Sequence, residues 1–393
     1  MTSYNTPTAA GSARFASIQF CRCLAATLVV LYHTDLQIMR LADGRHLQLG
    51  FGAAGTDMLF VISGFVLVLT THGRSVHIGS YIFKRFARIA PLYWAFTLGM
   101  LAMFLIAPAL FYSTAFDAKH FLASMLFIPY AHPVMGKLQP FLVPGWALNQ
   151  IAFFYVLFGL GLLLPSRFRV PAVTLVLVAL VMRRWFLGGS DALLDFYGMP
   201  VVLDFALGML VCRLCLSQDL VSRPVIGAVF AVSAAIFAAG VLRGTSSGDD
   251  RILYWGIAFA GVLFSLVSIE RTWGWWNPGF MTRLGDASFS IYLSNLFTLA
   301  ICTKLIRAVG MFPTLGVLGT KAVLAGCALA VGLLIGMLVE RPLNGLLLAQ
   351  TKRAPDVKGA LHQSHPTDQG IERRQINRAL SQLTKPYRWL ALR

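Results

Sequence analysis

Long apolar segments recur along the whole chain, and they constrain its fold more than any other feature. Each segment is roughly as long as the 20 or so residues that a helix needs to cross the hydrocarbon core of a bilayer. The ten segments are residues 17–38, 51–71, 89–108, 144–164, 170–187, 196–214, 225–242, 252–269, 286–306 and 317–339. The sequence therefore predicts an all-α fold, a polytopic membrane bundle of about ten transmembrane helices.

The composition supports this interpretation. Hydrophobic residues make up 57% of the 393 positions and charged residues only 12%, about half the charged fraction of a typical soluble domain. The net charge of +17 is explained by basic residues beside helix ends and in the tail, where anionic membrane lipid attracts them. Because no basic, aromatic-rich soluble domain is present, we expect no nucleic-acid partner.

Three regions follow from the pattern of polarity. Residues 1–16 form a polar N-terminal segment, residues 17–345 the transmembrane domain, and residues 346–393 a basic tail. Near the end of the tail, apolar residues recur among arginines at close to helical spacing, which predicts either an interfacial amphipathic helix or a disordered segment. Residues 119–131 are apolar but too short to span, so they predict an interfacial or re-entrant helix.

Basic clusters set the expected orientation. The clusters at 84–88 and 167–169, together with the tail, fall on the same side as the N-terminus if the number of spans is even. Because cytoplasmic flanks are enriched in Lys and Arg, we expect both termini in the cytoplasm. The six cysteines lie in or beside apolar segments, which is typical of packing residues, and we expect no metal site.

Two ionisable residues, Arg22 and His33, interrupt the first apolar segment. Ionisable groups inside a membrane are costly, and they mark candidate functional sites. Their separation corresponds to about three helical turns, so both side chains lie on one helix face, roughly 16 Å apart along the axis. One stripe therefore presents a fixed cation at one depth and a titratable imidazole at another.

Asp57 is expected at the depth of His33 on the neighbouring, antiparallel span. A contact between them has two interpretations that the spacing does not separate. The carboxylate could orient the imidazole as a general base, or the pair could be a structural hydrogen bond between two helices. Arg85 and Arg88 share a helix face before the third span, where paired guanidiniums bind phosphate or anchor the helix at the membrane surface.

Several segments resemble the acyltransferase family 3 membrane proteins, and most closely the branch that acylates bacterial exopolysaccharide. The similar segments occur in the order typical of the family and extend from residue 18 to residue 343. They are Ile18–Arg22 through Val30–His33, Gly52–Asp57 through Phe60–Phe65, Lys84–Trp94, Gly145–Asn149 with Phe153–Tyr155, Leu284–Leu293 and Glu340–Leu343.

The resemblance implies a membrane O-acyltransferase of the bacterial inner membrane. It implies that an acyl group, usually acetyl, moves from acyl-CoA to a hydroxyl of a glycan, free or lipid-linked. His33 resembles the catalytic base, Arg22 its partner on the same helix, and Asp57 the acidic residue of the second motif. Arg85 and Arg88 resemble the contacts to the donor phosphates. Candidate substrate-binding positions within or beside the similar segments are Ser63, Trp146, Asn149, Gln150, Tyr155 and Asn295.

The chain departs from the family pattern at three positions. Ile151 occupies a position where the exopolysaccharide branch usually has glutamate, Asn295 one where histidine is frequent, and Cys23 one where glycine is expected. An amide does not exchange protons near neutral pH, so we expect no proton transfer at Asn295. Two alternatives to an active enzyme follow: an inactive relative that binds acyl-CoA or glycan, and a transporter that uses the same polar stripe.

Overall fold

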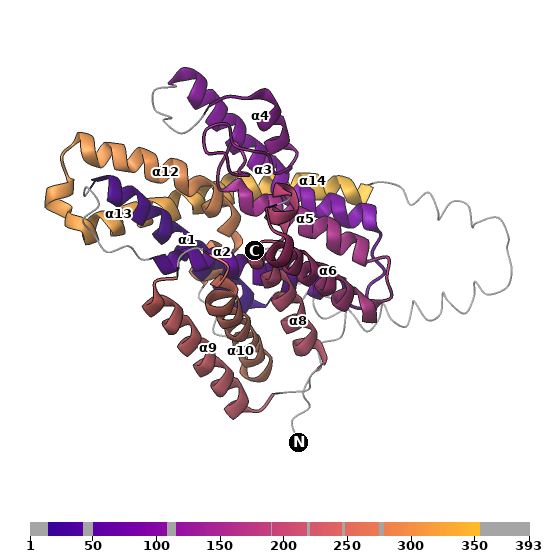
Figure 1. Ribbon diagram of the computed structural model, residues 1–393. Coiled ribbons are helices and arrows are strands. Elements are labelled where there is room, and N and C mark those ends of the chain that lie inside the picture. Colours follow the sequence, from indigo (N-terminus) through magenta and orange to yellow (C-terminus); the bar gives the residue numbers. More distant parts are fainter. Residues whose placement is uncertain are drawn as a thin grey trace, which may run out of the picture. The chain divides into compact units, whose positions relative to one another are not determined.

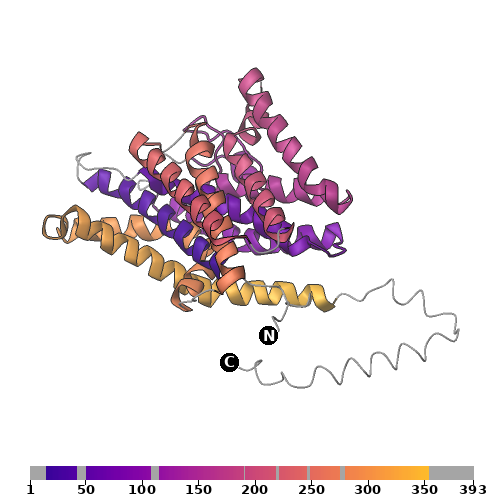
Figure 2. The same ribbon diagram turned by 90° about the horizontal axis from the view of Figure 1, so that it is seen from below.

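The computed structural model describes residues 15–41, 50–107, 115–189, 191–217, 221–245, 248–274 and 279–353. This part of the chain is helical apart from turns, loops and an isolated antiparallel bridge between Ala131 and Leu138. The chain divides into two units, Met1–Leu348 and Ala349–Arg393. The first contains the helix bundle (Figures 1 and 2).

Within the described ranges, nine helical stretches are long and apolar enough to cross a membrane. They are formed by α1 (Ala16–Leu41), η1 (Gly50–Ala53) with α2 (Ala54–Thr71), α3 (Ile78–Ile106), α6 (Ser166–Leu187), η3 (Pro200–Val202) with α8 (Leu203–Ser217), α9 (Arg223–Arg243), η4 (Ile252–Gly256) with α10 (Ile257–Trp273), α12 (Ser288–Ala308), and α13 (Phe312–Ile335) with η5 (Gly336–Glu340) and α14 (Arg341–Arg353). A tenth apolar helix, α5 (Gly145–Gly161), is shorter.

Each predicted span coincides with one of these ten helices, so the all-α membrane bundle is confirmed. The remaining short helices are α4 (Ala118–Met125), α7 (Ala192–Tyr197) and α11 (Gly279–Asp286). Of the segment 119–131, α4 is the helical portion, and Asp117 caps it by accepting a hydrogen bond from the His120 backbone N–H at 2.6 Å. The amphipathic helix predicted in the tail lies outside the described residues.

The start of the third span differs from the prediction. We expected it near residue 89, where the apolar segment begins, but α3 begins at Ile78 and includes Pro91. The helix therefore continues beyond its apolar portion. As a result Lys84, Arg85 and Arg88 project from a regular helix, which fixes their spacing.

The centre of the bundle is the crossing of α2 and α8. A Cβ on Gly64 would lie 2.1 Å from the Phe205 carbonyl oxygen, and one on Gly208 would lie 1.8 Å from that of Val61. Glycine at both positions lets the two backbones touch, as small residues do in membrane helix pairs.

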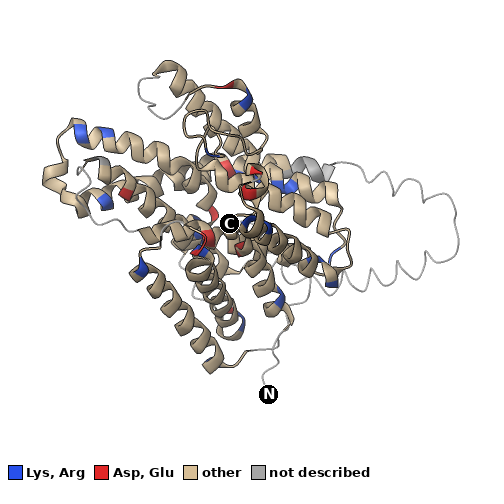
Figure 3. Ribbon diagram, viewed as in Figure 1, with Lys and Arg blue, Asp and Glu red and all other residues tan. Residues whose placement is uncertain are grey.

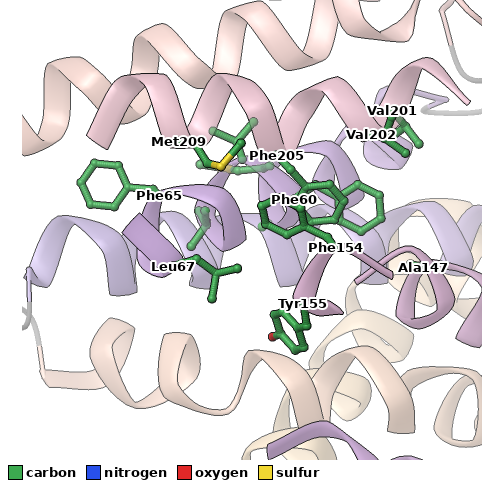
Figure 4. Close-up of a cluster of buried hydrophobic side chains, with 14 of the residues drawn as sticks. Phe60, Phe65, Leu67, Ala147, Phe154, Tyr155, Val201, Val202, Phe205 and Met209 are labelled. Carbon is green, nitrogen blue, oxygen red and sulfur yellow. The ribbon is translucent and has the colours of Figure 1, made fainter. Parts of the chain in front are cut away.

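An aromatic stack lies beside this crossing (Figure 4). The Phe205 ring stacks between Phe60 and Phe154, with centroid distances of 4.6 and 4.1 Å. All three rings are fully buried, and Tyr155 points away from the stack. The stack connects α2, α5 and α8, and it leaves the opposite face of α5 to line a cavity.

Candidate functional site

A basic chamber opens where α3 begins and α13 ends. The cavity, of about 1020 Å³, is lined by residues from the α2–α3 turn, the first turns of α3, Asp286 and the start of α14. Its cationic side chains are Arg74, Lys84, Arg85, Arg88 and Arg341. Most of the helical ribbon in Figure 3 is tan, with charged residues at scattered positions. Five cations around one cavity are therefore a candidate anion site.

The cations of the chamber fall into two groups. Arg341 forms an ion pair with Asp286 at 3.0 Å. Arg74, Lys84 and Arg88 have no ion pair with any described carboxylate. Arg74 and Lys84 are exposed and Arg88 is half-buried, so these three side chains are available to an anionic ligand that enters the chamber.

Arg85 is held in place at the inner end of the chamber. Its Nη2 donates a hydrogen bond to Thr70 Oγ1 at 2.6 Å, and its guanidinium lies over the rings of Tyr81 and Tyr155, 5.5 and 6.0 Å from their centroids. Hydrogen bonding and cation–π contact orient the planar guanidinium. A planar, fixed guanidinium is suited to bidentate binding of phosphate.

A narrow throat of about 100 Å³ continues from the chamber into the bundle, and both cavities share Arg85 and Arg88. The predicted site residues Arg22, Ser63, Arg85, Arg88 and Tyr155 all line this throat. Most of its other lining is apolar, including Leu59, Phe60, Ile62, Val66, Leu148 and Ile151. The structure therefore brings three guanidiniums from α1 and α3 to one constriction.

His33 lies beyond the throat on α1. Its Nδ1 is 2.7 Å from Asn295 Oδ1. The Asn295 Nδ2 donates to the carbonyl oxygens of Tyr292 and Ile291, at 2.6 and 3.1 Å. These two bonds turn the amide oxygen toward the imidazole, so Nδ1 carries the ring proton and Nε2 has a free lone pair.

The throat and His33 both contact α12. Tyr292 lines the throat, and Asn295 is one helical turn further along, roughly 5 Å. Tyr292 is itself fixed, because its hydroxyl donates to the Pro144 carbonyl oxygen at 2.7 Å. The imidazole thus lies about one turn past the constriction.

The predicted contact between Asp57 and His33 is wrong. Asp57 is fully buried and forms an ion pair with Arg251, with Nη2 2.5 Å from Oδ2, and His33 is held by Asn295 instead. A buried carboxylate is compensated much better by a guanidinium than by a neutral ring. Arg251 is 194 residues away in sequence, and no local pattern indicated that it would reach Asp57.

The predicted residues of α5 have different surroundings. The Trp146 ring packs edge-on against Phe60 with centroids 6.2 Å apart. Gln150 is fully buried, and its Nε2 donates to the Phe196 carbonyl oxygen at 2.7 Å. Asn149 is also fully buried, and neither of its amide atoms has a partner among the described residues. An orphaned amide of this kind indicates a bound water or ligand.

Sequence reasoning missed several lining residues. Ser288, Phe289 and Tyr292 contribute to the throat, and Thr70 positions Arg85. The first three lie in the segment Leu284–Leu293, which had been noted only for its resemblance. Among the described residues, no group of three or more His, Cys, Asp or Glu side chains could hold a metal ion.

Comparison with known proteins assigns the bundle to a class. A family model described as an acyltransferase domain matches residues 15–339. The chain belongs to this acyltransferase family 3 of multi-pass membrane proteins, and it is an acyltransferase. It is 34% identical over 304 residues to the exopolysaccharide production protein ExoZ of Rhizobium meliloti (strain 1021). The aligned region covers 76% of this chain and 91% of that protein. No solved structure matches the chain.

Proposed function

We propose that this protein transfers an acyl group, most simply acetyl, from acyl-CoA to a hydroxyl of an exopolysaccharide or its lipid-linked precursor. The observation that carries the proposal is a basic chamber beside an arginine-lined throat, with His33 bonded to Asn295 one helical turn from the throat residue Tyr292. The similarity to an exopolysaccharide production protein supports the choice of acceptor.

The two cavities match the two parts of an acyl-CoA. The chamber of about 1020 Å³ offers several cations to a polyphosphate head, since guanidinium–phosphate bonds are charge-assisted and strong. The throat of about 100 Å³ has mostly apolar walls, so it favours a slender uncharged arm and a small acyl group. A long acyl chain would not fit without widening of the throat.

The proposed reaction uses the free nitrogen of His33. As the acceptor oxygen attacks the thioester carbonyl, His33 Nε2 removes the hydroxyl proton, and the proton on Nδ1 remains bonded to Asn295. Arg22 lines the throat, roughly 16 Å from His33 along α1, and it holds the donor arm that carries the thioester. Collapse of the oxyanion that the attack forms breaks the carbon–sulfur bond, and the leaving thiolate accepts the proton that His33 received.

The arrangement also agrees with the orientation expected from charge. The donor chamber lies at the bundle end that carries the first residues of α3 and the last residues of η5, which is the end predicted to face the cytoplasm. Acyl-CoA is made there. We therefore place the protein in the bacterial inner membrane, with the donor entering from the cytoplasm and His33 toward the other face.

The test is acyl transfer from labelled acetyl-CoA to an exopolysaccharide acceptor by purified protein in detergent or nanodiscs. We expect His33→Ala to abolish transfer while retaining donor binding and a native melting curve. The matched control is Thr34→Ala, whose buried hydroxyl donates to the Val30 carbonyl oxygen of its own helix at 2.8 Å, and it should remain active. Full turnover by His33→Ala would disprove the base assignment, and donor binding without turnover in the wild type would disprove an active enzyme.

A further inference from the structure

A second buried charged cluster lies away from the throat, where the first turns of α2 and α8 meet η4. Arg251 donates from Nη2 and Nε to the two oxygens of Asp57, at 2.5 and 3.3 Å, and from Nη2 to the Ala53 carbonyl oxygen at 3.1 Å. Asp57 is fully buried, and the Arg251 side chain is only 15% exposed. The acyl-transfer mechanism proposed above does not use this cluster.

Asp204 adds a second carboxylate to the cluster. It is fully buried in the first turn of α8, beside both Asp57 and Arg251. Neither of its oxygens accepts a hydrogen bond from a described donor. The backbone of η4 packs directly against it, because a Cβ on Gly256 would lie 2.1 Å from Asp204 Oδ1.

The charges of this cluster do not balance. Two carboxylates face one guanidinium, and the further group beside Arg251 among the described residues is the phenol of Tyr32. An uncompensated charge inside a membrane domain is costly, and adjacent buried carboxylates do not both ionise. A buried carboxylate without any donor is best explained if one of the two acids carries a proton and donates it to the other.

We propose that Asp57 and Asp204 form a proton-binding site that holds one shared proton beside Arg251. The shared proton links α8 to α2, and the ion pair links the start of η4 to α2. The cluster therefore holds together three segments that are distant in sequence. The η4 segment is a π-helical turn, a distortion that is frequent at functional positions, and here it brings Gly256 against the acid pair. This role is independent of the proposed donor and acceptor.

Infrared difference spectroscopy tests the proposal on the full-length protein. We expect the spectrum of wild type minus Asp204→Asn, at neutral pH, to contain a carbonyl stretching band of one protonated carboxylic acid that shifts in D2O. The control is Asp286→Asn, because Asp286 is partly exposed and paired with Arg341, and it should show carboxylate bands alone. A difference spectrum of Asp204→Asn with carboxylate bands alone would overturn the proposal.

Asp57→Asn tests whether the proton is shared. It leaves Asp204 as the only carboxylate beside Arg251, so Asp204 should ionise and the same carboxylic acid band should disappear. If the band persists in Asp57→Asn, Asp204 holds its proton alone and sharing is disproved. Because Asn replaces a neutral acid with little change in shape, Asp204→Asn should also melt within a few degrees of the wild type. The spectrum of Asp204→Asn therefore tests whether a proton is bound even if Asp57→Asn does not fold.

Discussion

At the scale of single residues, the departure at Asn295 has a structural explanation. An amide in place of the histidine frequent in the family does not exchange protons, but its oxygen is 2.7 Å from His33 Nδ1 and its nitrogen is anchored to two backbone carbonyls. The amide can therefore select the tautomer of the imidazole and hold its orientation. The loss of one titratable group leaves the proposed base intact.

We predict that Asn295→Ala lowers kcat by about a hundredfold with little change in KM for the donor, because a displaced catalytic group typically costs about that factor. Thr298→Ala is the matched control, since Thr298 lies on the same helix and its hydroxyl donates to the Ser294 carbonyl oxygen at 3.1 Å. Steady-state kinetics of both variants check the prediction, and an unchanged kcat in Asn295→Ala would contradict it.

At the scale of helices, the α2–α8 crossing positions one wall of the throat. Leu59, Ser63 and Val66 of α2 face the cavity, while Gly64 and Gly208 bring the two helices into backbone contact on the other side of α2. Any residue larger than glycine at this crossing separates the helices. Separation would move the throat wall along with α2.

We predict that Gly208→Ala destabilises the protein by about 1–3 kcal/mol, the usual cost of overpacking, because the added Cβ would lie 1.8 Å from the Val61 carbonyl oxygen. Gly227→Ala is the control, since nothing lies within 4 Å of its Cβ position on α9, and it should be neutral or slightly stabilising. Thermal unfolding in detergent measures the stability of both variants. Equal melting temperatures would contradict the backbone contact between α2 and α8 at Gly208.

The connection between α4 and α5 contains His132, whose pKa is shifted by its surroundings. His120 Nε2 donates to the Gln139 carbonyl oxygen at 2.8 Å, and His132 Nδ1 accepts from the N–H groups of Val134 and Met135 at 3.2 and 3.3 Å. Burial, and secondarily the neighbouring His120, lowers the pKa of His132 from its ordinary value of 6.5. The neutral ring is thus favoured in the folded loop.

We predict that this loop loses protection from hydrogen exchange as the pH falls below about 6.5, because the unfolded loop then binds a proton that the folded loop does not. Above that pH its stability should be constant. Hydrogen–deuterium exchange of residues 126–144 at several pH values measures the effect. In His132→Asn, whose amide oxygen can accept the same N–H groups, the pH dependence should vanish, and an unchanged dependence would refute the assignment.

At the scale of the whole molecule, the bundle separates two tasks along its length. Cations gather in the chamber at one end, and His33 lies outside the residues that line the chamber and the throat. In the proposed function, this separation would let donor and acceptor approach from opposite faces of a membrane. Substitutions in the chamber should therefore change donor binding without changing the chemistry at His33.

We predict that Arg88→Gln raises KM for acyl-CoA about 10- to 100-fold, since a hydrogen bond to a charged group contributes about 1.5–3 kcal/mol, while kcat changes much less. Increasing salt should weaken donor binding less in this variant than in the wild type. Arg283→Gln is the control, because Arg283 is exposed and lines neither cavity. A fall in kcat with unchanged KM would instead place Arg88 in the chemical step.

The sequence alone determined the architecture and part of the site. Helices that cross a bilayer need long apolar segments, so the ten spans could be read directly from hydropathy. Arg22, Arg85 and Arg88 were identifiable because charges are rare in such helices, and helical periodicity placed each on a definite face. These features depend on neighbours within a few turns of the same helix.

Only the tertiary structure decided which polar groups meet. Matched depth predicted Asp57 beside His33, but helices of equal depth have several neighbours, and the packing of α2 against α8 and η4 turns Asp57 toward Arg251 and Asp204. The packing of α1 against α12 gives His33 its partner Asn295, which is 262 residues away in sequence. Depth in a membrane is a local property of one segment, whereas the partner of a buried charge depends on how all the helices pack together.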